Sequence, residues 1–157
     1  MRRHLLPVLT LTTALLASCG SYLPDQPDID VGGSYVGRII GSEGRTALLD
    51  VTVQEKDLRV SATVTSRETG QSFTLVGTRS VYKSSPVTVD TLAELGSGSV
   101  CPGGFTERYQ VRATFERAGR GGPVGARGAV LHQTCDAATS LYQYDSANSG
   151  MLELTRR

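Results

Sequence analysis

The stretch from residue 47 to residue 65, ALLDVTVQEKDLRVSATVT, contains the pattern that decides the fold. Apolar and polar residues alternate through Ala47–Gln54, and they alternate again through Leu58–Thr65. Successive side chains of a β-strand point to opposite faces, so a period of two predicts strands with one buried face. The polar segment Glu55–Asp57 between the two runs is short, as in a hairpin. The stretch therefore predicts two adjacent antiparallel strands.

Similar runs recur along the rest of the chain. Alternation is also regular in Tyr109–Glu116, and the remaining runs are shorter or interrupted. Short polar or glycine-rich segments separate most of the runs, whereas parallel neighbours would need connections of about a dozen residues or more. We therefore expect an antiparallel meander of about eight strands. The expected strands are Ser34–Ile40, Ala47–Gln54, Leu58–Thr65, Ser72–Arg79, Pro86–Leu92, Tyr109–Glu116, Val124–Thr134 and Gly150–Thr155.

The two ends of this meander predict how it closes. An open meander exposes two strand edges, which proteins avoid because such edges pair with other chains. Pairing the first strand with the last would remove both edges. We expect an all-β domain over residues 33–157 that forms a closed or nearly closed barrel. A two-sheet β-sandwich is the alternative.

The N-terminal segment has the composition of a secretory signal. Arg2 and Arg3 precede an uncharged, mostly apolar run from Leu5 to Ala17, and small residues follow. A basic head, an apolar region of about 7–15 residues and a cleavage site form a signal peptide. A helix that spans a bilayer needs about 20 apolar residues. Residues 1–18 are therefore predicted to be a signal peptide rather than a permanent membrane span.

The tetrad Leu16-Ala17-Ser18-Cys19 resembles the lipobox of bacterial lipoproteins at all four positions. This resemblance implies cleavage before Cys19 and attachment of a diacylglyceryl group to its thiol, and two acyl chains suffice for stable anchoring. An ordinary signal peptide with an incidental cysteine is the alternative. In enterobacterial lipoproteins an aspartate after the cysteine resembles a signal for retention in the inner membrane. Gly20 at that position favours the outer membrane or the cell surface.

Residues 19–32 are predicted to be the lipidated N-terminus and a flexible tether. The segment 20–32, GSYLPDQPDIDVG, has two prolines, three aspartates and little apolar pattern. Such a segment would hold the domain away from the membrane.

The charge balance excludes one class of partner. Loss of residues 1–18 would leave 14 basic and 15 acidic groups. A nucleic-acid-binding protein needs a clustered basic surface to neutralise phosphates. We therefore expect no nucleic acid as partner.

Cys101 and Cys135 remain as a pair once Cys19 is assigned to lipid. An even pair in an exported protein predicts a disulfide, which would contribute roughly 3–4 kcal/mol by closing the intervening loop. The alternative is a metal site in which His132 and Asp136 join the two cysteines. We expect the disulfide and no metal or other cofactor.

His132 is the only histidine beyond the predicted signal, and no G-x-S-x-G or H-E-x-x-H motif is present. A hydrolytic site needs a base beside a nucleophile and an orienting carboxylate. We predict no catalytic residues and a structural role for His132. The remote alternative is a hydrolase with a site around His132 and Asp136.

Two groups of side chains are candidates for binding. The glycine-rich segment 119–128, GRGGPVGARG, is interpreted as a hairpin tip rather than a phosphate loop, and Arg120 and Arg127 near it could contact an acidic partner. Tyr142 and Tyr144 lie in Ser140–Ser149, which is predicted to be a polar loop. Together with Tyr22 and Tyr109 they could line a barrel mouth. The alternative is packing of Tyr142 on the barrel end.

The first expected strand opens with Gly33, Tyr35 and Gly37 in a G-x-Y-x-G pattern. This pattern is similar to the first strand of calycin-type barrels, such as lipocalins and avidins, although the tryptophan common there is absent. Small lipoprotein barrels of this layout include enzyme inhibitors and ligand carriers. We therefore expect a membrane-anchored, non-enzymatic binding or structural protein of the cell envelope, whose partner is an envelope protein or a small apolar ligand. Inhibition would use loops such as Leu95–Phe105, whereas carriage requires small inward side chains that leave a cavity.

Overall fold

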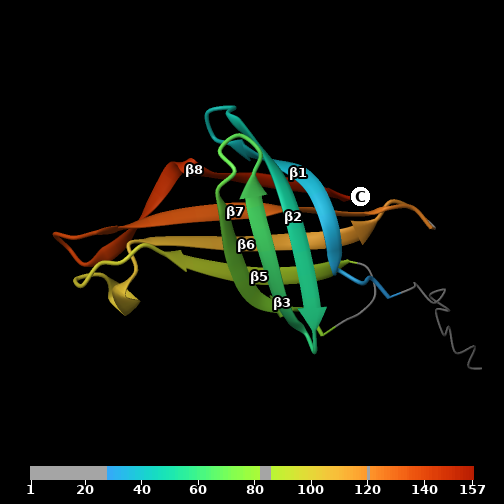
Figure 1. The fold of residues 1–157 in the computed structure, drawn as a ribbon, viewed down its shortest axis with the longest axis horizontal. Helices are drawn as coiled ribbons and strands as arrows, with labels where there is room; N and C mark the ends of the chain where they lie inside the picture. The colour runs from blue at the N-terminus through green and yellow to red at the C-terminus, as the bar shows by residue number, and fades with distance from the viewer. Residues whose placement is uncertain (1–27, 82–85, 120) are drawn as a thin grey trace, which may run out of the picture.

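Eight antiparallel strands form a closed barrel in sequence order, so the predicted meander and its closure are confirmed (Figure 1). The first strand pairs with the last from Tyr35↔Arg156 to Gly41↔Gly150, which excludes the two-sheet sandwich. The strands are β1 (Gly33–Gly41), β2 (Thr46–Lys56), β3 (Arg59–Ser66), β4 (Ser72–Arg79), β5 (Val87–Leu95), β6 (Glu107–Arg117), β7 (Val124–Asp136) and β8 (Leu141–Arg156), with a short 3-10 helix, η1 (Pro102–Gly104), between β5 and β6.

The structure, a computed structural model, describes residues 28–81, 86–119 and 121–157. The predicted signal peptide, Cys19, most of the predicted tether, Tyr22 and Arg120 lie outside the described residues. None of the helical segments within those ranges is long and apolar enough to cross a membrane.

Most of the expected strand boundaries lie close to the observed ones, and β4 matches residue for residue. The β2–β3 turn differs from the predicted connection Glu55–Asp57: β2 continues to Lys56, and Asp57 and Leu58, with positive φ angles of 51° and 66°, form the tight turn that leads into β3. Two-residue turns with two positive φ angles match the right-handed twist of the strands that they connect. Leu58 therefore belongs to the turn rather than to β3.

The largest difference concerns β8, which begins at Leu141 rather than at Gly150. The segment expected to be a polar loop pairs with β7 from Asp136↔Leu141 to His132↔Asp145. The sequence did not predict this part of β8 as a strand because it has no regular alternation of apolar residues. It lies beyond the barrel, so neither of its faces is buried.

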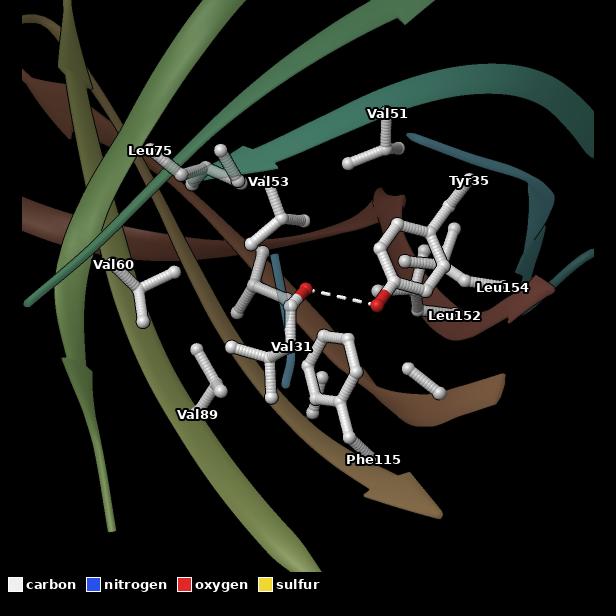
Figure 2. Close-up of a cluster of buried hydrophobic side chains, with 14 of the residues drawn as sticks. Val31, Tyr35, Val51, Val53, Val60, Leu75, Val89, Phe115, Leu152 and Leu154 are labelled. Carbon is white, nitrogen blue, oxygen red and sulfur yellow. Dashed lines mark hydrogen bonds between the residues drawn. The ribbon is translucent and has the colours of Figure 1, made fainter. Parts of the chain in front are cut away.

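The alternating residues of β2 and β3 point into the barrel as predicted, and Val51, Val53 and Val60 are buried there. Figure 2 shows them with inward side chains from strands on the other side, including Phe115 and Leu154. The hydrophobic core is therefore the barrel interior.

One end of the barrel is filled by the residues that precede β1. Ile29 and Val31 are 1% and 0% exposed, and the Tyr35 hydroxyl donates to the Val31 carbonyl oxygen at 2.8 Å (Figure 2). The end of the segment expected to be a tether is therefore part of the barrel. The apolar positions 29 and 31 are separated by one polar residue, and this short alternation was concealed by the surrounding prolines and aspartates.

Polar side chains fix this segment at the closed end. The Arg79 guanidinium, whose side chain is 4% exposed, donates to the Ile29 carbonyl oxygen at 3.1 Å and to the Glu55 carboxylate at 2.9 Å. Arg156 donates to the carbonyl oxygen of Gly32 and pairs with Asp30. Buried carbonyl groups need such partners, so these contacts determine where the segment lies.

At the opposite end, part of the barrel wall extends as an arm. The β4–β5 ladder ends at Val76↔Leu92 and the β1–β8 ladder ends at Gly41↔Gly150, while β6, β7 and β8 continue to pair with one another. Figure 1 shows this projection on the side away from the C-terminus. We call it the arm: Leu95–Gln110, Leu131–Asp136 and Leu141–Asp145.

Candidate functional site

The barrel encloses a cavity of about 450 Å³. Its wall consists mainly of valine, leucine and alanine side chains from the inward rows, among them Val51, Val60, Ala62, Val64 and Ala113. An eight-stranded barrel is just wide enough for large side chains to fill it or for small ones to leave room for one ligand. Near the closed end, the larger side chains of Tyr35 and Phe115 fill the barrel. Elsewhere the smaller inward side chains of β3 and β6 leave the interior open.

The cavity opens at the end opposite Ile29 and Val31. Its rim comes from the β1–β2 turn, the β3–β4 turn and β8. The rim residues include Arg45, Thr46, Glu68, Gln71, Asn148 and Ser149. The site thus has an apolar interior and a polar rim, which is the usual composition of a small-molecule pocket.

Charged groups are confined to that rim. Arg45 and Glu68 are the charged members of the cavity lining, and they have opposite signs. The Arg45 side chain is 83% exposed and lies 3.7 Å from Glu43, so it remains hydrated. An ionic group brought into the interior would lose its hydration with no opposite charge beside it. The cavity consequently suits a neutral, apolar molecule or an apolar chain.

His132 lies beside the mouth in a cluster that connects β6, β7 and β8. Its side chain is 4% exposed, with Nδ1 at 2.8 Å from Asp145 Oδ2 and Nε2 at 3.4 Å from Glu107 Oε2. The ring stacks on Tyr109, with 4.1 Å between centroids, and Tyr109 in turn stacks on Phe73 at 5.2 Å. Tyr109 and Phe73 line the cavity, so this cluster lies against the cavity wall.

The second side of the cluster is an irregular part of β8. The β7–β8 register shifts between Val130 and His132, and residues 146–149 form a bulge. Ser149 Oγ accepts a hydrogen bond from the His132 N–H at 2.8 Å and donates to the Asp145 carbonyl oxygen at 2.7 Å. Asp145 also accepts from Asn148 Nδ2 at 2.7 Å and from the Ala147 N–H at 3.0 Å.

Hydrogen bonds to the Asp145 carboxylate have an electrostatic consequence. The bond from Asn148, followed by that from His132, lowers the pKa of Asp145 below its ordinary value. A carboxylate that accepts several hydrogen bonds favours its charged form. Asp145 is thus held as an anion between His132 and the β8 bulge.

This arrangement differs from the site that a hydrolase would need. Asp145, rather than Asp136, is the carboxylate beside His132. Asp136 instead accepts hydrogen bonds in the β7–β8 turn from Ala138, Thr139 and Gln143. Both ring nitrogens of His132 face carboxylates, and the nearby Ser149 hydroxyl bonds backbone atoms, so none of these contacts activates a nucleophile.

Cys101 and Cys135 form a disulfide, as predicted, and it ties the loop after β5 to the end of β7. The two sulfurs are therefore bonded to each other rather than available as metal ligands. Within residues 28–81, 86–119 and 121–157, no group of three or more His, Cys, Asp or Glu side chains is placed to hold a metal ion.

The predicted tyrosines occupy different positions. Tyr109 lines the cavity, but neither Tyr142 nor Tyr144 does. The Tyr142 hydroxyl lies within the arm, at hydrogen-bond distance from the carbonyl oxygens of Phe105 at 2.8 Å and Pro102 at 3.1 Å. Tyr144 is 61% exposed on the arm.

Of the two predicted arginines, the structure describes Arg127, which does not line the cavity. Arg127 is exposed in β7, opposite Glu153 of β8. Arg120 lies outside the described residues. A role of either arginine in binding an acidic partner stays a prediction.

Glu107, Asp145 and the β8 bulge are the parts of the site that the sequence did not reveal. They contact His132 across 25, 13 and 17 positions of the chain. No spacing rule connects such residues, because the contacts depend on the β6–β7 register and on the bulge.

The chain matches no model of a known protein family, and no curated protein or solved structure is similar to it at a significant level.

Proposed function

We propose that this protein is an exported lipoprotein, anchored through acylated Cys19, whose barrel carries a small apolar ligand without catalysing a reaction. The observation that carries the proposal is the cavity of about 450 Å³ with its apolar wall. Ligand pockets of proteins have volumes of about 300–1,000 Å³. A ligand would gain roughly 25 cal/mol for each Å² of apolar surface that it removes from water.

The position of the closed end supports this arrangement on a membrane. The described chain begins at Asp28, next to Ile29 at the end opposite the mouth, so the connection back to Cys19 would start from that end. Each residue of that connection spans at most about 3.6 Å, so the barrel would lie within roughly 30 Å of the bilayer. The mouth would then face away from the membrane to which the protein is attached.

Ligand binding can be tested with the Cys19→Ser variant of the full chain and the neutral fluorophore N-phenyl-1-naphthylamine. We expect saturable binding of one probe molecule per barrel. Ala62→Phe would place a ring in the cavity and abolish binding, whereas Thr63→Phe would place the same ring on the exposed face of β3 and preserve it. Equal binding by the two variants, or no binding by a folded barrel, would contradict carriage.

The anchor has an independent test. Cys19→Ser should release the protein into the soluble fraction of cells and abolish incorporation of labelled palmitate, with the Cys101–Cys135 disulfide retained. A Cys19→Ser protein that still sediments with membranes would contradict lipidation at Cys19.

A second candidate is inhibition of an envelope enzyme through the arm. Val100, Leu141 and Tyr144 are 52%, 64% and 61% exposed there, and the disulfide fixes the loop that carries Val100. Large exposed apolar side chains favour protein contacts. Crosslinking to an envelope enzyme that is lost in a Leu141→Asp, Tyr144→Asp variant, but retained in Ala62→Phe, would favour this function over carriage.

A further inference from the structure

We propose that the buried hydroxyl of Thr91 is a polar recognition point in the cavity wall, and that it selects an uncharged, mainly apolar ligand that carries a hydroxyl group. This inference rests on the proposed carrier function, because it names the class of ligand that the same cavity would hold. Three observations support it: the position of Thr91, the hydrogen bond that its side chain makes, and the apolar side chains around it.

Thr91 belongs to the inward-facing row of β5, which runs from the closed end of the barrel toward the arm. Val89 and Ala93 flank it along that row, and all three residues are buried. Thr91 is the residue before Leu92, at which the ladder between β4 and β5 ends. It lines the cavity and is 6% exposed. A hydroxyl group is therefore built into the wall of the cavity.

The side chains beside Thr91 on the neighbouring strand are apolar. Val111 of β6 lies directly opposite it in the ladder, Ala113 lies opposite Val89, and both line the cavity. Polar members of the lining such as Ser66 and Gln71 belong instead to the β3–β4 turn region at the rim. Burial of a hydroxyl in apolar surroundings costs free energy unless the hydroxyl is hydrogen-bonded. Thr91 therefore needs a hydrogen-bond partner.

The partner that the protein supplies is a weak one. Thr91 Oγ1 donates to the Val111 carbonyl oxygen at 3.4 Å, whereas O–H···O bonds normally measure about 2.5–3.0 Å. A threonine hydroxyl also has two lone pairs that accept hydrogen bonds. Among the residues that the structure describes, none donates a hydrogen bond to this oxygen. Its lone pairs are therefore open to a donor on a ligand.

These properties define the group that the ligand presents. A donor to Thr91 Oγ1 must carry an O–H or N–H proton, and it must be neutral because a charge in the apolar interior would lose its hydration. A hydroxyl is the smallest group that meets both conditions. A hydrocarbon of the same shape would leave the Thr91 oxygen buried and unpaired, and sites with such a polar group reject ligands that lack the matching one.

The empty barrel provides a first test that needs no ligand. Valine has nearly the shape of threonine, so Thr91→Val removes the hydroxyl and retains the packing. Because the bond to Val111 is long, we expect Thr91→Val to have an unfolding midpoint in urea at least as high as that of the parent protein. A lower midpoint would assign the hydroxyl to the fold itself and overturn its role in recognition.

The binding test uses the Cys19→Ser protein as the parent, with N-phenyl-1-naphthylamine as a reporter whose dissociation constant is measured separately for each variant. The competitors are the ortho, meta and para phenylphenols and the methylbiphenyls of matching substitution, which have a methyl group in place of the hydroxyl. We expect Thr91→Val to weaken binding of at least one phenylphenol about tenfold relative to its methylbiphenyl, as for loss of one hydrogen bond.

Two variants serve as controls. Thr91→Ser keeps the hydroxyl and should keep the preference for the phenylphenol. Thr63→Val makes the same change on the exposed face of β3 and should bind every competitor as the parent does.

The outcomes separate failure of this inference from failure of the carrier function. If the reporter binds but Thr91→Val changes the affinities for phenylphenols and methylbiphenyls equally, or changes neither, the role of Thr91 is overturned and carriage stands. If neither the reporter nor any competitor binds the folded parent protein, carriage is refuted, and this inference fails with it.

Discussion

Tyr35 in β1 donates its hydroxyl proton to the carbonyl oxygen of Val31, four residues earlier, and both residues are buried at the closed end of the barrel. Removing a buried donor leaves its acceptor unsatisfied, at a cost of about 1–3 kcal/mol. Tyr35→Phe should therefore lower the free energy of unfolding by that amount in urea titrations. Tyr144→Phe, at an exposed position, is the matched control and should change stability little.

Alkaline pH should destabilise the protein through its buried tyrosines. Burial raises the pKa of Tyr35, partly offset by Arg156, and burial also raises the pKa of Tyr109. A raised pKa means that the folded state holds the proton more tightly, so this contribution to stability is complete below about pH 10 and is lost above it. The loss should be smaller in Tyr35→Phe and Tyr109→Phe than in the parent protein, as measured by thermal unfolding across that range.

Acid should remove a different contribution to the stability of the folded state, that of the Asp145 carboxylate. The lowered pKa of Asp145 stabilises the folded state above the ordinary range of carboxyl groups, and this stabilisation is lost as pH falls through the lowered pKa. Asp145→Asn should therefore flatten the stability profile below about pH 4. Asp50→Asn is the control for an exterior carboxylate whose pKa is also lowered, chiefly by the hydrogen bond from Arg67. An unchanged acid profile in Asp145→Asn would contradict the assignment.

The segment before β1 should behave as core rather than as linker. Ile29→Ala would leave a void among buried side chains and should cost about 2–5 kcal/mol. Asp28→Ala changes the exposed neighbouring residue and should have little effect on the unfolding midpoint. A stable Ile29→Ala protein would show that the closed end tolerates loss of this side chain.

The disulfide should stabilise the arm together with the rest of the barrel. Its two cysteines are separated by 34 positions, and closure of such a loop contributes roughly 3–4 kcal/mol. Paired Cys101→Ala and Cys135→Ala replacements should lower the free energy of unfolding accordingly. Addition of a reductant should destabilise the parent protein and leave the double variant unaffected.

Much of the fold could be predicted because the barrel has one buried face and short connections. The rows through Val51, Val53 and Val60 alternate as a barrel wall requires, and the short turns leave only antiparallel pairing. The outer half of β8 could not be recognised, since Asp145 and Asn148 bond one another and their neighbours instead of forming an apolar row.

The candidate site was less predictable than the fold. The small side chains of Ala62 and Ala113 are visible in the sequence, but they are compatible with either a filled core or a pocket. The outcome depends on which side chains the opposite strands bring together: Tyr35 and Phe115 meet edge to face inside the barrel, and which residues would do so could not be known without the strand register. His132 was expected to have a structural role, and its partners became identifiable only when the strand register was known.

The segment through Ile29 and Val31 also gives the molecule a mechanical property. Tension on the chain before Asp28 acts first on these two side chains and on the hydrogen bond from Tyr35, before it reaches the β1–β2 ladder. The closed end of the barrel therefore bears the load when the N-terminal side is pulled.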